Sequence, residues 1–313
     1  MFDPRCNDDA RERESGSRDL GRGSRGGTDT RERERERVEP REVFAGHVDL
    51  PRGREREHVW VHEHSHTLRG SESRTLASVG AFRVIPADDL RDTFDKPLDP
   101  RHGELWHLRE AGLVQTVRVG RDISAVTLTK EGHDLLEGHR RDHRAPDRQT
   151  FNHGVLRPRE LRHDAEVYRA YLDEADRLHE AGATIHRVVL ENELKSEYQA
   201  FLQEPNRDRE NCDGRPDRSL LEIEAWAHEH NLPCDEHGHV QFPDFRIEYD
   251  VDGLDHRLDV EVMTPHYRGA HAAAKVRAGF TRYSAIGARL SGASGGSRSG
   301  RARDSRLAEE MLP

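Results

Sequence analysis

Residues 103–114 read GELWHLREAGLV, and residues 126–136 read VTLTKEGHDLL. The first stretch has apolar residues at the spacing of one helix face, and it reaches Gly112, a residue type suited to ending a helix. The second stretch begins as a β-rich segment, and its Thr129 is placed to cap a following helix. Between them, short alternating segments flank a turn at residues 120–122. The sequence therefore predicts a helix, a two-stranded hairpin and a second helix.

Two further helices are predicted before these stretches. Residues 72–82 have apolar residues at helical spacing, and residues 85–90 read IPADDL, where proline and the acids suit a first helical turn. The third helix is expected to open at residues 99–100. Three helices, a hairpin and a helix are the order of a winged helix-turn-helix domain, which we assign to residues 71–141. The two quoted stretches resemble the recognition helix and the wing of the MarR/PadR-type group.

This assignment predicts DNA binding, because the third helix of such a domain enters the major groove with its polar face toward the base edges. The candidate DNA-binding residues are Arg101, His102, Trp106 and Arg109 on the helix, and Arg118 and Arg121 on the wing. The wing arginines are placed for phosphates or the minor groove. Asp99, Glu104 and Glu110 would repel phosphate, and they keep open the alternative that the domain binds a protein.

Other parts of the chain are predicted to lack a core. Residues 1–70 are rich in Arg, Glu, Gly and Ser, which predicts a disordered charged arm. His62, His64 and His66 alternate in this arm as on a strand, so they could bind a metal or be there by chance. Residues 142–158 are interpreted as a linker, and residues 291–313 as a flexible tail with a short terminal helix.

A second, small α/β domain is predicted over residues 159–290. Its expected helices are residues 161–181, 193–202, 218–230 and 268–283, and its expected strands are residues 184–190, 240–251 and 257–263. The last two strands are joined through an Asp-Gly turn, which is typical of a hairpin. The fold class is therefore α+β with two domains, a disordered arm and a tail.

The paired strands carry a candidate metal site. Asp244 follows a proline at the start of one strand, and Glu261 lies in the next. This pattern resembles the PD-(D/E)xK nucleases, in which two carboxylates bind Mg²⁺ or Mn²⁺ and a lysine orients water. The resemblance implies Asp244, Glu261 and a lysine as catalytic residues. Met263 stands at the usual lysine position, and Lys275 is the candidate substitute.

The region from residue 71 to about 285 resembles the replication-relaxation family of plasmids and other mobile elements. The resemblance rests on a winged helix and linker, on His163-Asp164 opening a long helix with Tyr168, and on the Pro-Asp and Glu strands. It implies a DNA-binding accessory protein of plasmid replication or conjugative transfer, with a relaxase or other mobile-element protein as partner. The missing lysine favours an inactive nuclease-like domain. An active metal-dependent endonuclease and a transcriptional regulator are the alternatives.

The composition narrows these possibilities. Of the 313 residues, 33% are hydrophobic and 35% are charged, which is too polar for one core along the whole length. The net charge of -10 argues against a global polyanion binder, so any nucleic-acid surface is expected to be a local patch. No apolar run is long enough to span a bilayer, the N-terminus does not resemble a secretory signal, and the three cysteines have no regular spacing. We therefore expect a cytoplasmic protein without membrane contact.

Overall fold

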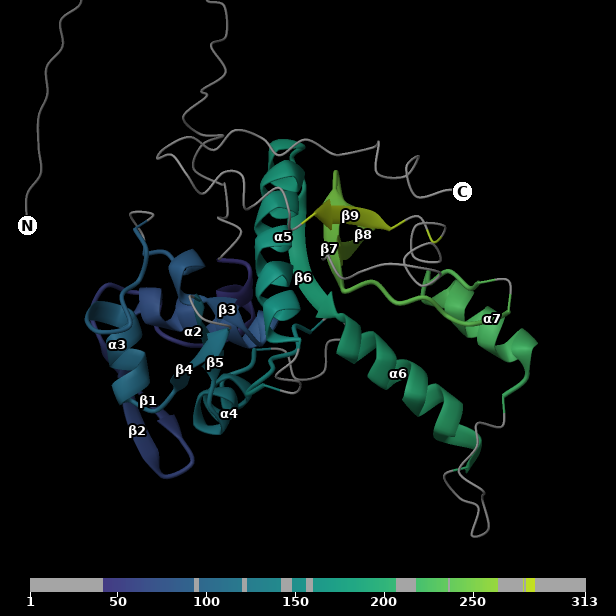
Figure 1. Cartoon of the computed structure of the whole chain (residues 1–313). Helices are drawn as coiled ribbons and strands as arrows, with labels where there is room; N and C mark the ends of the chain where they lie inside the picture. Colours follow the sequence, from purple (N-terminus) through teal and green to yellow (C-terminus); the bar gives the residue numbers. More distant parts are fainter. Residues whose placement is uncertain are drawn as a thin grey trace, which may run out of the picture. The chain divides into compact units, whose positions relative to one another are not determined.

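The computed structural model describes residues 42–92, 96–119, 123–141, 148–155, 160–206, 218–235, 237–263, 278 and 280–284. All of these residues fall within one structural unit, residues 38–313. The described residues form α-helices and three small sheets, which is an α+β architecture (Figure 1). Residues 1–41 and 285–313 lie outside the described part. They include the first 41 residues of the expected arm and the whole of the expected tail.

The described structure begins with a short 3-10 helix and a β-hairpin. They are η1 (Phe44–His47), β1 (Glu57–Val61) and β2 (His64–Leu68). Alternate residues of β1 are buried, and Phe44 and Leu68 have no exposed surface. The interpretation of residues 42–70 as part of a disordered arm is therefore wrong. The few apolar residues of this polar stretch almost all point into the core, so a low apolar content was sufficient for order.

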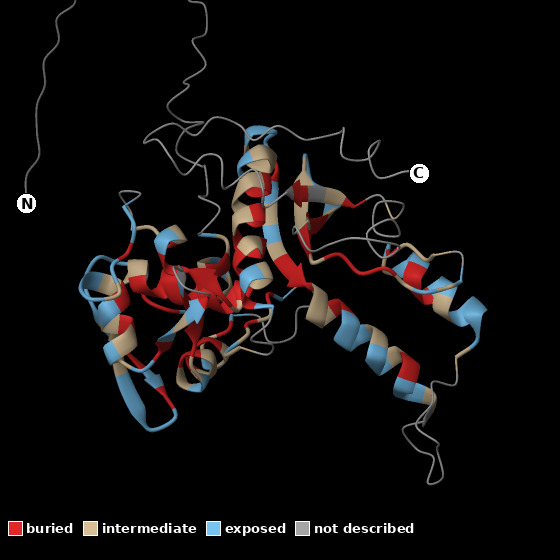
Figure 2. Cartoon of the chain, viewed as in Figure 1, coloured by how far each residue is buried: buried red, intermediate tan, exposed pale blue. Residues whose placement is uncertain are grey.

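The next elements are α2 (Gly70–Phe82), β3 (Ile85–Pro86), η2 (Ala87–Asp89) and α3 (Gly103–Glu110). α2 is buried along nearly its whole length (Figure 2). The helix expected at residues 85–90 is only the single 3-10 turn η2. α3 begins three residues after the expected Pro100, because His102 is extended and Gly103 adopts a positive φ of 74°.

The predicted hairpin and last helix are confirmed as β4 (Val114–Val119), β5 (Ile123–Leu128) and α4 (Lys130–Gly138). β4 and β5 pair antiparallel, and β3 pairs with the other edge of β5, giving the strand order β3-β5-β4. The Thr129 hydroxyl accepts a hydrogen bond from the Gly132 amide at 3.1 Å, which caps α4 as predicted. The hairpin tip, residues 120–122, lies outside the described part.

The second half contains α5 (Leu161–Glu180), β6 (Thr184–Leu190), α6 (Glu191–Gln203), η3 (Glu204–Asn206), α7 (Leu220–Glu229), β7 (Phe245–Val251), β8 (Leu254–Met263) and β9 (Thr281–Ser284). The sheet order is β6-β7-β8-β9. β6, β7 and β8 pair antiparallel, and β9 pairs parallel to β8. The predicted hairpin through Asp252 and Gly253 is confirmed.

The expected helix over residues 268–283 is wrong at its end, because Thr281–Ser284 form a strand. Phe280 and Tyr283 are buried, and parallel pairing with β8 overrides the helical tendency of the small residues before them. Most of that expected helix, residues 268–277 and 279, lies outside the described part.

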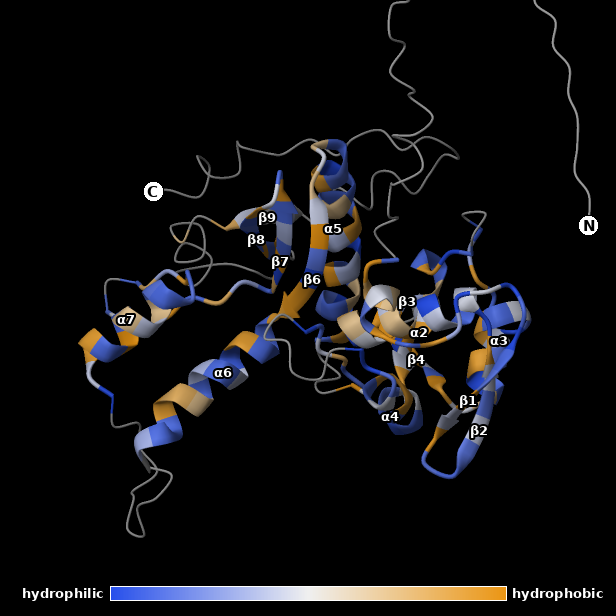
Figure 3. Ribbon diagram, turned by 180° about the vertical axis from the view of Figure 1, so that it is seen from behind, coloured by the Kyte–Doolittle hydropathy of each residue, from blue (hydrophilic) through white to orange (hydrophobic). Residues whose placement is uncertain are grey.

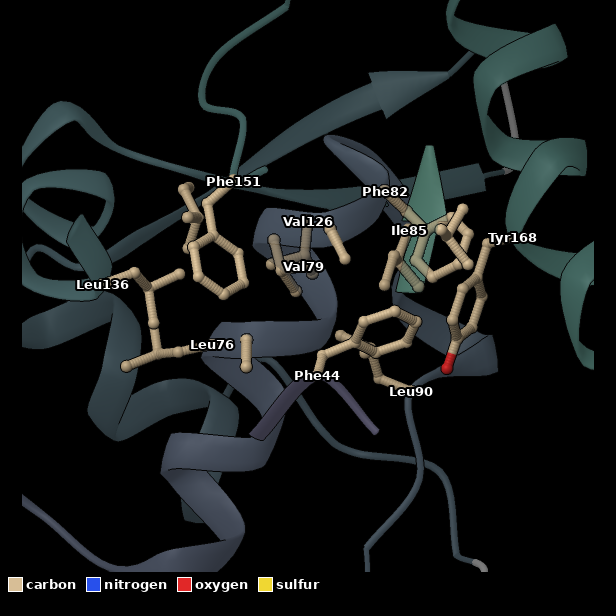
Figure 4. Close-up of a cluster of buried hydrophobic side chains, with 14 of the residues drawn as sticks. Phe44, Leu76, Val79, Phe82, Ile85, Leu90, Val126, Leu136, Phe151 and Tyr168 are labelled. Carbon is tan, nitrogen blue, oxygen red and sulfur yellow. The ribbon is translucent and has the colours of Figure 1, made fainter. Parts of the chain in front are cut away.

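One apolar core joins the two halves. The ring centroids of Phe44 and Phe82 lie 5.3 Å apart, and the Phe82 centroid lies 5.0 Å from that of Tyr168 (Figure 4). The Phe82 centroid also lies 4.8 Å from that of Tyr171. Both tyrosines belong to α5, which carries hydrophobic and hydrophilic residues along its length (Figure 3). In the stretch interpreted as a linker, Phe151 is also buried.

Candidate nucleic-acid interface and acidic site

The predicted recognition helix α3 has the polarity expected of a surface helix. Leu105 and Leu108 are completely buried. Arg101 and His102, just before the helix, are exposed, and the Trp106 side chain on its outer face is 41% exposed. The candidate Arg109 is half-buried. The sequence therefore identified the exposed and the buried face of α3 correctly.

The acids around α3 all have basic partners. Glu104 accepts a hydrogen bond from Arg69 at 3.0 Å, and Glu110 from Arg109 at 3.2 Å. Asp99 lies 3.0 Å from the Nδ1 atom of His102. These pairs reduce the repulsion that the three carboxylates would exert on a phosphate. The Arg109 pair also occupies one of the candidate DNA-binding groups.

On the wing, Arg118 lies in β4 opposite Ser124 of β5, and its side chain is exposed. It makes no ion pair with any residue that the structure describes. Arg121 lies outside the described residues. The described wing therefore offers one cationic side chain.

The candidate acidic site lies where α5 meets β7 and β8. Asp244 immediately precedes β7, and one carboxylate oxygen accepts a hydrogen bond from the Val262 amide at 2.7 Å. The other oxygen lies 3.1 Å from the Nε2 atom of His163, in the first turn of α5. The Glu261 residue, in β8, is only 1% exposed. The structure thus places Asp244 directly before β7 and Glu261 in the neighbouring strand β8, together with a histidine that was not among the predicted site residues.

The charges at this site change two pKa values. Burial alone would lower the pKa of His163, but the hydrogen bond and charge of Asp244, with the charges of Asp164 and Glu261, raise it to about 9. Burial raises the pKa of Asp164 to about 6, although His163 and Arg83 oppose this. At neutral pH His163 is therefore an imidazolium beside the Asp244 carboxylate.

The described residues of this site do not fit a divalent metal ion. Both Asp244 oxygens already have partners, one of them cationic. Among the described residues, no group of three or more His, Cys, Asp or Glu is arranged to hold a metal. Met263 ends β8 and has no basic group, and Lys275 lies outside the described part. The Asp244 carboxylate is thus paired within the described part of the protein.

The other histidine clusters also pair with carboxylates. His64 Nδ1 and His66 Nε2, on β2, lie 2.7 and 3.2 Å from the same Glu131 oxygen of α4. His62 lies 3.6 Å from Asp134. The sequence showed the spacing of the histidines. It did not predict their pairing with these acids, which are about 70 residues away in the chain.

No family model, curated protein or solved structure matches the chain. None of the helices that the structure describes is long and apolar enough to cross a membrane.

Proposed function

We propose that this protein binds duplex DNA through α3 and the β4–β5 wing. The main support for this proposal is the strand order β3-β5-β4, in which a strand before α3 pairs with the second strand of the hairpin after it. In a winged helix, this pairing fixes the wing beside the recognition helix. The exposed Arg101, His102 and Trp106 then lie on one surface element, and Arg118 lies on the other.

The second half is proposed to be a nuclease-like scaffold without catalytic activity. A PD-(D/E)xK-like core is supported by α5 followed by β6, β7, β8 and β9, with α6 and α7 inserted between β6 and β7 and with β9 parallel to β8. Inactivity is supported by the His163–Asp244 pair, since an imidazolium takes the position of a counter-ion to Asp244. By the resemblance to the replication-relaxation family, the biological role is that of an accessory protein in plasmid replication or conjugative transfer, with a relaxase or another mobile-element protein as partner.

Fluorescence anisotropy with a labelled 30-base-pair duplex of mixed sequence tests the DNA-binding proposal. Arg101→Ala and Arg118→Ala should each weaken binding several-fold, and the log-log salt slope should fall by about 0.9 for each phosphate that is no longer neutralised. Arg257→Ala is the matched control, because Arg257 is an exposed arginine on β8. Unchanged binding by both test variants would exclude this surface.

The same protein preparations distinguish the alternative of an active nuclease. Supercoiled plasmid incubated with Mg²⁺ or Mn²⁺ should remain intact under conditions in which the duplex is bound. Nicking that Asp244→Asn abolishes would establish the metal-dependent endonuclease instead.

A further inference from the structure

A completely buried carboxylate lies beneath α3. Glu72, in the first turn of α2, is 0% exposed. Its two oxygens accept hydrogen bonds from Arg56 Nη2 at 2.6 Å and Arg56 Nε at 3.3 Å. The Arg69 amide donates to it at 3.1 Å. A buried carboxylate without such donors would be strongly unfavourable, so this arrangement fixes both the position and the orientation of Glu72.

The same carboxylate reaches α3. The Glu72 Oε1 atom lies 3.1 Å from Nδ1 of His107, in the middle of α3, but the geometry of this contact is not that of a hydrogen bond. Arg69, which donates its amide to Glu72, also donates its guanidinium to Glu104 in the first turn of α3 at 3.0 Å. The first turn of α3 is therefore hydrogen-bonded to Arg69 at the start of α2, and the next turn lies against the Glu72 carboxylate.

The polar contacts of α3 restrict its rotation about the helix axis, which its apolar contacts do not. Leu105 and Leu108 hold α3 against the core, but the hydrophobic effect is non-directional and tolerates small rotations of a helix. Hydrogen bonds have narrow distances and angles, so the bond from Arg69 to Glu104, with the Arg69 amide held by Glu72, restricts the rotation of α3 about its axis. That rotation decides whether Arg101 and Trp106 meet base edges or miss them.

We propose that Glu72 is a positioning residue for DNA sequence recognition by α3, and that Arg56 acts through it. This inference rests on the proposed function. It also gives the segment before β1 a role, because Arg56 precedes that strand by one residue. DNA affinity from phosphate contacts should survive the removal of Glu72, since those contacts come from arginines on the surface.

The test is selection from a library of duplexes with a 20-base-pair random core, followed by anisotropy on the enriched duplex. The wild-type protein should enrich a motif. Glu72→Gln should bind the enriched duplex about tenfold more weakly, with an unchanged salt slope and unchanged binding to the unselected library. Arg56→Gln should act in the same direction. The double variant should bind no more weakly than Glu72→Gln alone, because both changes interrupt one network.

Glu174→Gln is the matched control, because Glu174 is a buried glutamate paired with Arg177 on α5 and the charge change is the same. It should retain the motif and the affinity of the wild type. The inference is overturned if Glu72→Gln keeps both, or if the two changes are additive. If Glu72→Gln does not fold, the Arg56→Gln variant tests the inference instead. The Arg56 side chain is 41% exposed, so this change should not prevent folding. A wild type that binds no duplex would instead overturn the proposed function.

Discussion

At the level of single residues, His163 explains how the half-buried Asp244 and the buried Glu261 coexist. Asp244 and Glu261 lie at adjoining ends of β7 and β8, where like charges would repel. An imidazolium 3.1 Å from Asp244 offsets part of that repulsion. The sequence revealed both carboxylates through their strand pattern. It did not reveal the pairing of His163 with Asp244, because 81 residues separate the two and only the packing of α5 on the sheet brings them together.

This ion pair makes stability depend on pH. The pKa of His163 is raised to about 9 in the folded protein, against about 6.5 when unfolded, so its stabilisation is complete below pH 6.5 and is lost as the pH rises through 9. The difference corresponds to about 3 kcal/mol. Urea unfolding at pH 6.5 and pH 9.5 should therefore show a larger loss of stability in the wild type than in His163→Gln.

His179→Gln is the control for this measurement, because His179 lies in the last turn of the same helix. It should follow the wild-type pH dependence. Equal losses of stability in the wild type and His163→Gln would exclude the ion pair as their source.

At the level of elements, long periodic segments were predictable and short ones were not. α5 and β6 matched their predicted bounds to within one residue, because their apolar periodicity runs over many residues. β1, β2 and β9 have four or five residues each, too few for a period to be distinguished from chance. They also make contacts with residues distant in sequence, such as Glu131 of α4, which pairs with His64 and His66 of β2.

The missed N-terminal elements should be essential for stability. Phe44 in η1 is fully buried between the rings of Phe82 and Tyr171. Phe44→Ala removes most of these ring–ring interactions and leaves a cavity, which should cost about 3–5 kcal/mol and lower the thermal midpoint by roughly 10 °C. Deleting residues 1–41 should leave the midpoint nearly unchanged. Differential scanning calorimetry of both variants checks this, and a neutral Phe44→Ala would show that η1 contributes little.

At the scale of the whole molecule, the shared core couples the two halves of the chain across the predicted linker. The predicted boundary at residues 142–158 separates α2 from α5, yet Phe82 of α2 packs on Tyr168 and Tyr171 of α5. Gln149, within that boundary, is 1% exposed and exchanges two hydrogen bonds of 2.9 Å with the backbone of Val188 in β6. Such contacts couple the unfolding of the two halves.

A fragment of residues 42–141 should therefore not fold stably by itself. It retains every element of the proposed DNA-binding surface, but it lacks Phe151 and both α5 tyrosines, and the absence of each aromatic side chain exposes apolar surface worth about 2 kcal/mol. Together these terms approach the total stability of a typical small domain. The fragment should show no cooperative thermal transition by circular dichroism, whereas residues 42–313 should unfold in a single transition. A fragment that melts cooperatively and binds the duplex would mean that the packing against α5 is dispensable, and that the two halves are independent domains.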